Sequence, residues 1–156
     1  MAELVVRMGE IAASQHPGDV LVGLGLGSCV GLALIEEGSP VAAMAHIVLP
    51  DSNGAAAAPG KFADTAIPEL VRDVTGIGAA RSRLTAVLVG GAQMFATGGK
   101  LDIGQRNEQA VRAALEAARI PVRVYLSTCS VTCKEAGASE LEIATWSQAR
   151  TVMKAA

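Results

Sequence analysis

Aromatic residues are scarce in this sequence: two Phe, one Tyr and one Trp stand among 156 residues. The hydrophobic fraction is nevertheless 51%, so Ala, Val, Leu and Ile must supply the core. A chain of this length can bury one large core, and we expect a single domain over residues 1–156. No apolar run approaches the ~20 residues that span a bilayer, and no signal-type apolar segment opens the chain. We therefore expect no membrane insertion.

Positive charge and cysteine are also limited. The net charge is −2, so nothing favours a nucleic-acid backbone as partner. Three cysteines cannot all pair, which is more typical of a reducing cytoplasm than of a secreted disulfide framework. The chain has 17 glycines, but no GxGxxG or GKS/GKT pattern, so they do not indicate a phosphate-binding loop.

The most informative stretch runs from Leu21 to His46 and reads LVGLGLGSCVGLALIEEGSPVAAMAH. Two apolar runs flank a turn at residues 36–40, which predicts an antiparallel hairpin. If paired residues sum to about 75, Cys29 faces His46. A free cysteine often only fills core space, and a lone histidine beside an apolar run is often a satisfied core group. Their register favours a nucleophilic thiol next to the imidazole that accepts its proton.

The glycines before the thiol support this interpretation. Gly23, Gly25 and Gly27 alternate, so one face of the segment carries no side chains. The N–H groups of the bend at Gly27 and Ser28 would then be accessible to a developing oxyanion.

Hydrophobic periodicity predicts the remaining elements. The expected strands are Glu3–Met8, Gly9–Ser14, Val20–Leu24, Leu84–Val89, Ile120–Leu126, Glu140–Ala144 and Thr151–Lys154. One helix is expected over Phe62–Thr75, with Pro68 kinking it or moving its start. A second helix follows Asp102 as its N-cap.

Five segments in order resemble the CheD family of chemoreceptor glutamine deamidases. They are LGLGSCVG, AMAHIVLPDS, PGKFADTAIPELV, GGAQMF and IGQRN, and the similarity runs from about Gly9 to Arg119. The resemblance implies an α+β fold, a three-layer α/β/β sandwich. It also implies that Cys29 and His46 are catalytic, with no metal or organic cofactor. Asp51, Ser52 and Gln93 would contact substrate or neighbouring loops. Asn107, a polar residue in the IGQRN segment, would bridge the second helix to the glycine bend.

The implied reaction converts glutamine side chains of methyl-accepting chemotaxis receptors to glutamate. A CheC-type phosphatase would be the regulatory partner. The family usually has Thr six residues before the cysteine as the third catalytic member, whereas this chain has Gly23. The related toxin deamidases use a main-chain carbonyl to orient the histidine, and the carbonyl of Gly23 would take that role here.

Residues 127–156 depart from the family pattern. Cys129 and Cys133 stand where the family usually has a glycine-rich segment. Packing is the plainer account of the two thiols; a metal would need further ligands, and only His16 and Cys29 are available. Two other functions stay open. The chain could be an adaptor that binds receptor or CheC without catalysis, or a redox protein that uses Cys129 and Cys133.

Overall fold

The computed structural model describes residues 2–36, 39–55, 57–91, 102–122, 139–145 and 150–155, with only the backbone in the last two ranges. Within these residues, no helix has both the length and the apolar character that crossing a membrane requires. The predicted single domain over residues 1–156 remains a prediction.

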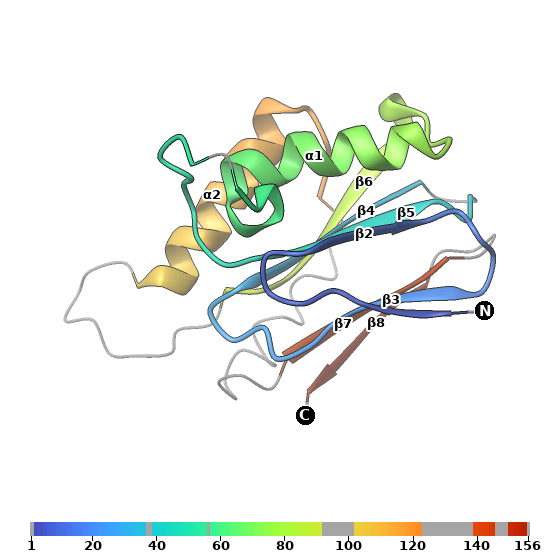
Figure 1. Cartoon of the computed structure of the whole chain (residues 1–156), viewed down its shortest axis with the longest axis horizontal. Coiled ribbons are helices and arrows are strands. Elements are labelled where there is room, and N and C mark those ends of the chain that lie inside the picture. Colours follow the sequence, from blue (N-terminus) through green and yellow to red (C-terminus); the bar gives the residue numbers. More distant parts are fainter. Residues whose placement is uncertain are drawn as a thin grey trace.

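The described strands form two four-stranded sheets (Figure 1). The strand order of the first sheet is β1 (Glu3–Val5), β3 (Asp19–Gly23), β7 (Ser139–Thr145) and β8 (Arg150–Ala155). The strand order of the second sheet is β2 (Ile11–Ser14), β5 (Ala42–Ile47), β4 (Val30–Glu36) and β6 (Leu84–Gly90). Strands β1 and β3 are parallel, and the other neighbouring pairs are antiparallel.

Two helices, α1 (Ala63–Gly76) and α2 (Ile103–Ala117), cover the outer face of the second sheet (Figure 1). Two 3-10 helices, η1 (Pro59–Lys61) and η2 (Arg81–Arg83), precede α1 and β6. The first sheet packs on the opposite face of the second (Figure 1). The predicted α+β fold with three layers, helices over two sheets, is confirmed.

Strand β4 belongs to both cores because its side chains alternate between the two faces of the sheet. Leu32 and Leu34 pack in the core between helices and sheet. Ala33 and Ile35 pack in the core between the two sheets. The strand is buried along its whole length, which explains why its sequence is a continuous apolar run rather than an alternating one.

The predicted helix over residues 62–75 is confirmed. Its four-residue stripe of Phe62, Ala66, Leu70 and Val74 is buried. Helix α1 begins at Ala63 and continues past Pro68, so the proline does not move its start.

The predicted register of the β4–β5 hairpin is wrong. Paired residues sum to 77: Ile35 pairs with Ala42, and Gly31 pairs with His46. The apolar runs locate two strands but leave the centre of the connecting turn undefined, so the pairing was displaced by two residues. Cys29 lies just before β4, and its position depends on the bend rather than on the strand register.

The C-terminal prediction is partly tested. The two closing strands are present as β7 and β8. Of the strand expected over residues 120–126, only 120–122 are described, and Val122 makes an isolated parallel bridge to Ala86. Cys129 and Cys133 lie outside the described residues.

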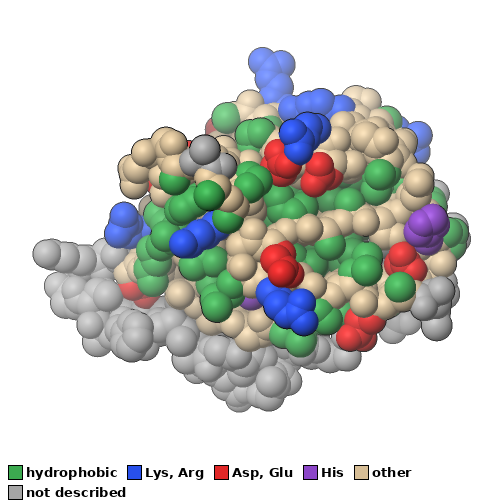
Figure 2. Space-filling model, in the orientation of Figure 1, with side chains coloured by type: hydrophobic (Ala, Val, Ile, Leu, Met, Phe, Trp, Pro, Cys, Tyr) green, Lys and Arg blue, Asp and Glu red, His purple; other side chains and the backbone are tan. Residues whose placement is uncertain are grey.

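Charged side chains of both signs lie on the described surface. On the face shown in Figure 2, basic and acidic side chains are interspersed. This distribution agrees with the net charge of −2.

Candidate active site

His46 lies near the end of β5 and points into the layer between the two sheets. Its side chain lies on the same face of the sheet as that of Met44, because residues two positions apart on a strand point the same way. Only 2% of the residue is exposed. The backbone on both sides is also held: His46 N donates to Glu10 O at 3.2 Å, and His46 O accepts from Gly9 N at 2.9 Å.

The imidazole is oriented by a main-chain carbonyl. His46 Nδ1 lies 3.1 Å from Val6 O. A carbonyl oxygen can only accept, so this bond assigns the proton to Nδ1 and leaves Nε2 as the basic nitrogen. Nε2 is buried and has no hydrogen-bond partner among the described residues. The ring is therefore fixed with its lone pair available.

The orienting carbonyl belongs to Val6 and not, as predicted, to Gly23. Val6 directly follows β1 and donates through its N–H to Val22 O at 2.8 Å, so it lies beside the end of β3. The resemblance to the toxin deamidases implied that a main-chain acceptor replaces the missing threonine hydroxyl. Which strand supplies it depends on how the two sheets face each other, and periodicity along one chain segment does not contain that information.

Cys29 directly precedes β4, and Gly31 of that strand pairs with His46. It is 7% exposed and is a free cysteine. The bend before it uses a positive φ of 51° at Gly27, and Cys29 N donates to Leu26 O at 2.7 Å to close the turn. The predicted glycine bend thus exists and delivers the thiol to the start of β4.

The end of β6 lies directly on this bend. Gly91 N donates to Cys29 O at 2.8 Å. Gly90 has a φ of +105°, and a Cβ added there would lie 2.1 Å from Cys29 O. The two backbones approach this closely only because residue 90 has no side chain.

Asn107 of α2 connects the segments that carry the two candidate catalytic residues. Its Nδ2 donates to Ser28 O and to Val48 O, each at 2.9 Å, and the residue is fully buried. The helix beneath it is capped by Asp102, whose Oδ1 accepts from Gln105 N at 2.8 Å. Both predictions for this helix, the Asp102 cap and the Asn107 bridge, are confirmed.

Burial keeps the two titratable groups neutral. It raises the pKa of the Cys29 thiol, because an anion is disfavoured away from water. It also lowers the pKa of His46, and the bond to Val6 and the charge of Glu10 offset this only in part. In the absence of substrate, Cys29 is therefore a neutral thiol and His46 a neutral imidazole.

The backbone donors of the bend differ in their availability. The N–H of Cys29 is occupied by Leu26 O, whereas the N–H groups of Gly27 and Ser28 donate to no acceptor within the described residues. The predicted oxyanion donors at Gly27 and Ser28 stay a prediction, and the Cys29 amide is the less available of the three.

Of the other three predicted site residues, the structure describes Asp51 and Ser52. Asp51 is exposed, and its Oδ1 accepts from Asn53 N at 2.7 Å. Ser52 is buried and donates twice to Asp64, from its N–H at 2.9 Å and from its hydroxyl at 2.6 Å. These bonds hold the loop before α1. Gln93 lies outside the described residues.

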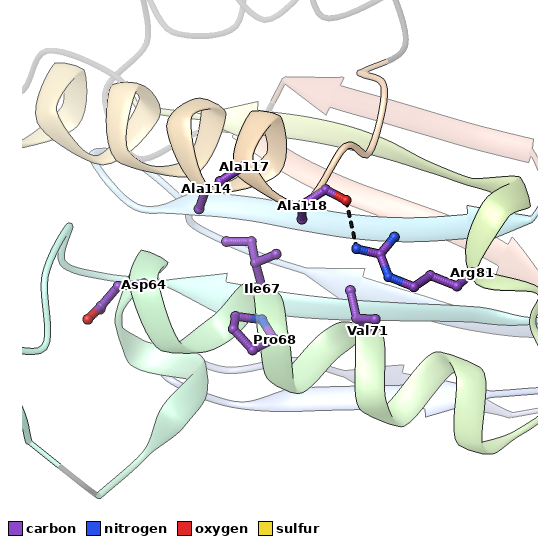
Figure 3. A pocket seen from close by; sticks show the side chains of 8 residues that line it. All are labelled: Asp64, Ile67, Pro68, Val71, Arg81, Ala114, Ala117 and Ala118. Atoms are coloured by element: carbon purple, nitrogen blue, oxygen red, sulfur yellow. Dashed lines mark hydrogen bonds between the residues drawn. The ribbon is translucent and has the colours of Figure 1, made fainter.

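A groove of about 560 Å³ lies elsewhere, between α1 and α2 (Figure 3). Its lining residues are Asp64, Ile67, Pro68, Val71, Arg81, Ala114, Ala117 and Ala118. Arg81 donates to Ala118 O at 2.7 Å across one side of it. The lining has neither thiol nor imidazole, and it belongs to the helical layer rather than to the layer between the sheets. In the described part of the chain, no group of three or more His, Cys, Asp or Glu residues is arranged to hold a metal.

Comparisons with known proteins agree with the motifs. The CheD family, described as chemotactic sensory transduction, matches residues 48–125. A probable chemoreceptor glutamine deamidase CheD of Symbiobacterium thermophilum is 50% identical over 116 residues, covering 70% of each chain. The chemoreceptor glutamine deamidase CheD of Thermotoga maritima is 46% identical over 112 residues, covering 72% of this chain and 70% of its own. A probable chemoreceptor glutamine deamidase CheD of Lachnoclostridium phytofermentans is 47% identical over 130 residues, covering 78% of this chain and 79% of its own.

Proposed function

Because the chain belongs to the CheD family, we propose that it is a chemoreceptor glutamine deamidase that uses Cys29 and His46. The names of the relatives support the reaction and the receptor substrate. The choice of residues rests on the state of His46: Nδ1 is bonded to Val6 O, and Nε2 has no partner among the described residues. The Cys29 bend leads into β4, where Gly31 pairs with His46.

The first half of the reaction forms a thioester. His46 Nε2 takes the proton of the Cys29 thiol as the sulfur attacks the carboxamide carbon of the substrate glutamine. The carbonyl oxygen becomes an oxyanion, which the N–H groups of Gly27 and Ser28 stabilise. The tetrahedral intermediate collapses when the His46 imidazolium returns its proton to the departing nitrogen, so ammonia leaves and the acyl group remains on sulfur.

The second half hydrolyses the thioester. His46 Nε2 removes a proton from water, and the resulting hydroxide attacks the acyl carbon. The carbon–sulfur bond breaks, the proton returns to Cys29, and a glutamate side chain is released. Val6 O fixes the tautomer of His46 throughout, because the proton on Nδ1 stays in its hydrogen bond while Nε2 exchanges protons.

The initial proton transfer depends on substrate. Burial keeps both groups neutral in the free protein, so a thiolate–imidazolium pair forms only as sulfur attacks. An adaptor that binds receptor without deamidating it is the alternative favoured by this same burial, since a neutral thiol is a weak nucleophile.

The proposal extends to location and partner. We place the protein in the cytoplasm with the signalling portion of methyl-accepting chemotaxis receptors, and we expect a CheC-type phosphatase to bind it. The motif resemblance supports both. Copurification of the full chain with a CheC-type protein tests the second point, and no complex at micromolar concentrations would contradict it.

Substitution of the thiol tests the mechanism. Cys29→Ala should abolish ammonia release from a receptor fragment while the fold survives, because losing one thiol costs on the order of 1 kcal/mol of stability. Conversion of glutamine to glutamate is followed by mass spectrometry, and folding by circular dichroism. His46→Ala should also abolish activity, whereas His16→Ala, at the other histidine of the chain, should retain it.

Three outcomes separate the alternatives. Activity in folded Cys29→Ala removes Cys29 from the mechanism. A parent protein that binds the receptor fragment but releases no ammonia supports the adaptor. Activity that depends on both Cys29 and His46 supports the deamidase.

A further inference from the structure

We propose that Asn107 is a positioning residue that holds the Cys29 bend and the end of β5 in register, so that the thiol and the imidazole of His46 meet. The inference rests on the proposed function. Within the described residues, Asn107 makes no hydrogen bond to either side chain of the candidate pair; it acts through two backbone carbonyls.

On the thiol side, Asn107 completes the fixation of one peptide unit. The carbonyl of Ser28 and the N–H of Cys29 belong to the same planar group. Asn107 Nδ2 holds that carbonyl at 2.9 Å, and Leu26 O holds that N–H at 2.7 Å. The next peptide unit is held through Cys29 O by Gly91 N at 2.8 Å. The Cα of the nucleophile is therefore fixed from both sides.

On the histidine side, the same nitrogen holds Val48, two residues after His46. Val48 O accepts from Asn107 at 2.9 Å, while Val48 N donates to Lys61 O at 2.8 Å. One buried NH₂ group thus connects two segments that are far apart in sequence and that carry the two halves of the site.

The chemistry of the side chain favours positioning over general stability. A primary amide offers two donors on one atom, which matches two carbonyls. Its oxygen, Oδ1, is buried without a hydrogen-bond partner among the described residues. A buried unpaired acceptor is unfavourable, so a residue selected for stability alone would not leave one. The fold retains the amide for its donors.

Alkylation of Cys29 tests the proposal without requiring deamidation. The rate with iodoacetamide at neutral pH is followed on the Cys29 peptide by mass spectrometry, since the chain has three cysteines. Asn107→Ala should slow this reaction, because the thiol loses its aligned base. Adding Asn107→Ala to His46→Ala should cause no further decrease, since both changes remove the same interaction. Ammonia release should fall on the order of 10²-fold, as for a catalytic group displaced by about 1 Å.

Two control variants separate alignment from folding. Gln105→Ala removes an amide from the same helix at an exposed position and should change neither rate. Asp102→Ala removes the helix cap and lowers the melting temperature, but it keeps the Asn107 bonds and should leave alkylation near the parental rate. If Asn107→Ala does not fold, Asn107→Ser, which keeps a single donor, is measured in its place and should show a smaller decrease.

The outcomes are distinct. A loosened bend with no positioning role would expose the thiol, so alkylation that is unchanged or faster in folded Asn107→Ala overturns the inference. Decreases that add fully in the double variant also overturn it. If the parent releases no ammonia but its alkylation depends on His46 and Asn107, the positioning role stands and the deamidase proposal fails. If ammonia release depends on Cys29 but not on Asn107, the reverse holds.

Discussion

At the scale of the residue, the burial of His46 should make the stability of the fold depend on pH. Its ring is held by Val6 O and shielded from water, and its pKa lies below the ordinary value of about 6.5 because burial disfavours the imidazolium. In the unfolded chain the ring regains its ordinary pKa. Below about pH 6.5 the unfolded state therefore binds more protons than the folded state does.

This difference gives a signed prediction for stability. The contribution of His46 is present above about pH 6.5 and is lost as the pH falls toward its folded pKa. The free energy of unfolding should therefore decrease on acidification, with a slope of up to about 1.36 kcal/mol per pH unit from this group. His46→Gln, which cannot titrate, should lack that component.

Urea denaturation at steps from pH 8 to pH 5 measures the effect. Asp19 does not interfere, because its pKa is lowered by the hydrogen bond from Ser14 and its contribution is lost only below about pH 4. Parallel pH curves for the parent and His46→Gln would contradict the burial account of His46.

At the scale of the element, the close approach of β6 to the Cys29 bend depends on a single glycine. A methyl group at residue 90 would collide with Cys29 O, and the φ of +105° adds strain for any side chain. Gly90→Ala should therefore lower stability by about 2 kcal/mol or more and should reduce ammonia release, because the bend must move.

Gly78→Ala is the matched control. Gly78 has a similar φ of +116°, but an added Cβ would meet nothing within 4 Å. That variant should lose only about 1 kcal/mol and keep parental activity. Equal losses in the two variants would show that backbone strain, and not the contact with Cys29, determines the effect.

The elements themselves follow from local chemistry, which explains how far the sequence could predict them. Buried apolar runs define β4, β5 and β6, and the four-residue stripe from Phe62 defines α1. Asp102 was predictable because a cap is recognisable from residue type and position before a helix, and the Asn107 bridge was predicted from its polarity and its place in the IGQRN motif.

The pairing between elements was less predictable. The hairpin register was displaced because a polar turn with Gly and Pro has no unique centre in the sequence. The contact of Val6 O with His46 joins residues 40 apart, one directly after a strand of the first sheet and the other in a strand of the second. Nothing in the residue types around Val6 distinguishes its carbonyl from that of any neighbour, so this part of the site required the tertiary structure.

At the scale of the whole molecule, the candidate site draws on all three layers. The first sheet leads into Val6, the second sheet supplies His46, and α2 supplies Asn107. The two cores between these layers have different roles. The helix–sheet core anchors α1 and α2, whereas the core between the sheets contains Val6 itself and sets the distance from its carbonyl to His46.

Two leucines test this division of roles. Leu70 lies in the helix–sheet core and Leu21 in the core between the sheets, and both are fully buried. Either leucine replaced by alanine should cost about 2–5 kcal/mol of stability. Leu70→Ala should keep kcat within about twofold, because α1 makes no hydrogen bond to Val6, His46 or the Cys29 bend among the described residues.

Leu21→Ala should lower kcat as well as stability. The cavity lies in the same cluster as Val6, and a shift of about 1 Å between the sheets is enough to cost on the order of 10²-fold in rate. Both variants are assayed at a temperature where circular dichroism shows them fully folded, so that the rates refer to native protein. If kcat falls equally in both, activity follows overall stability, and the core between the sheets has no separate role in orienting His46.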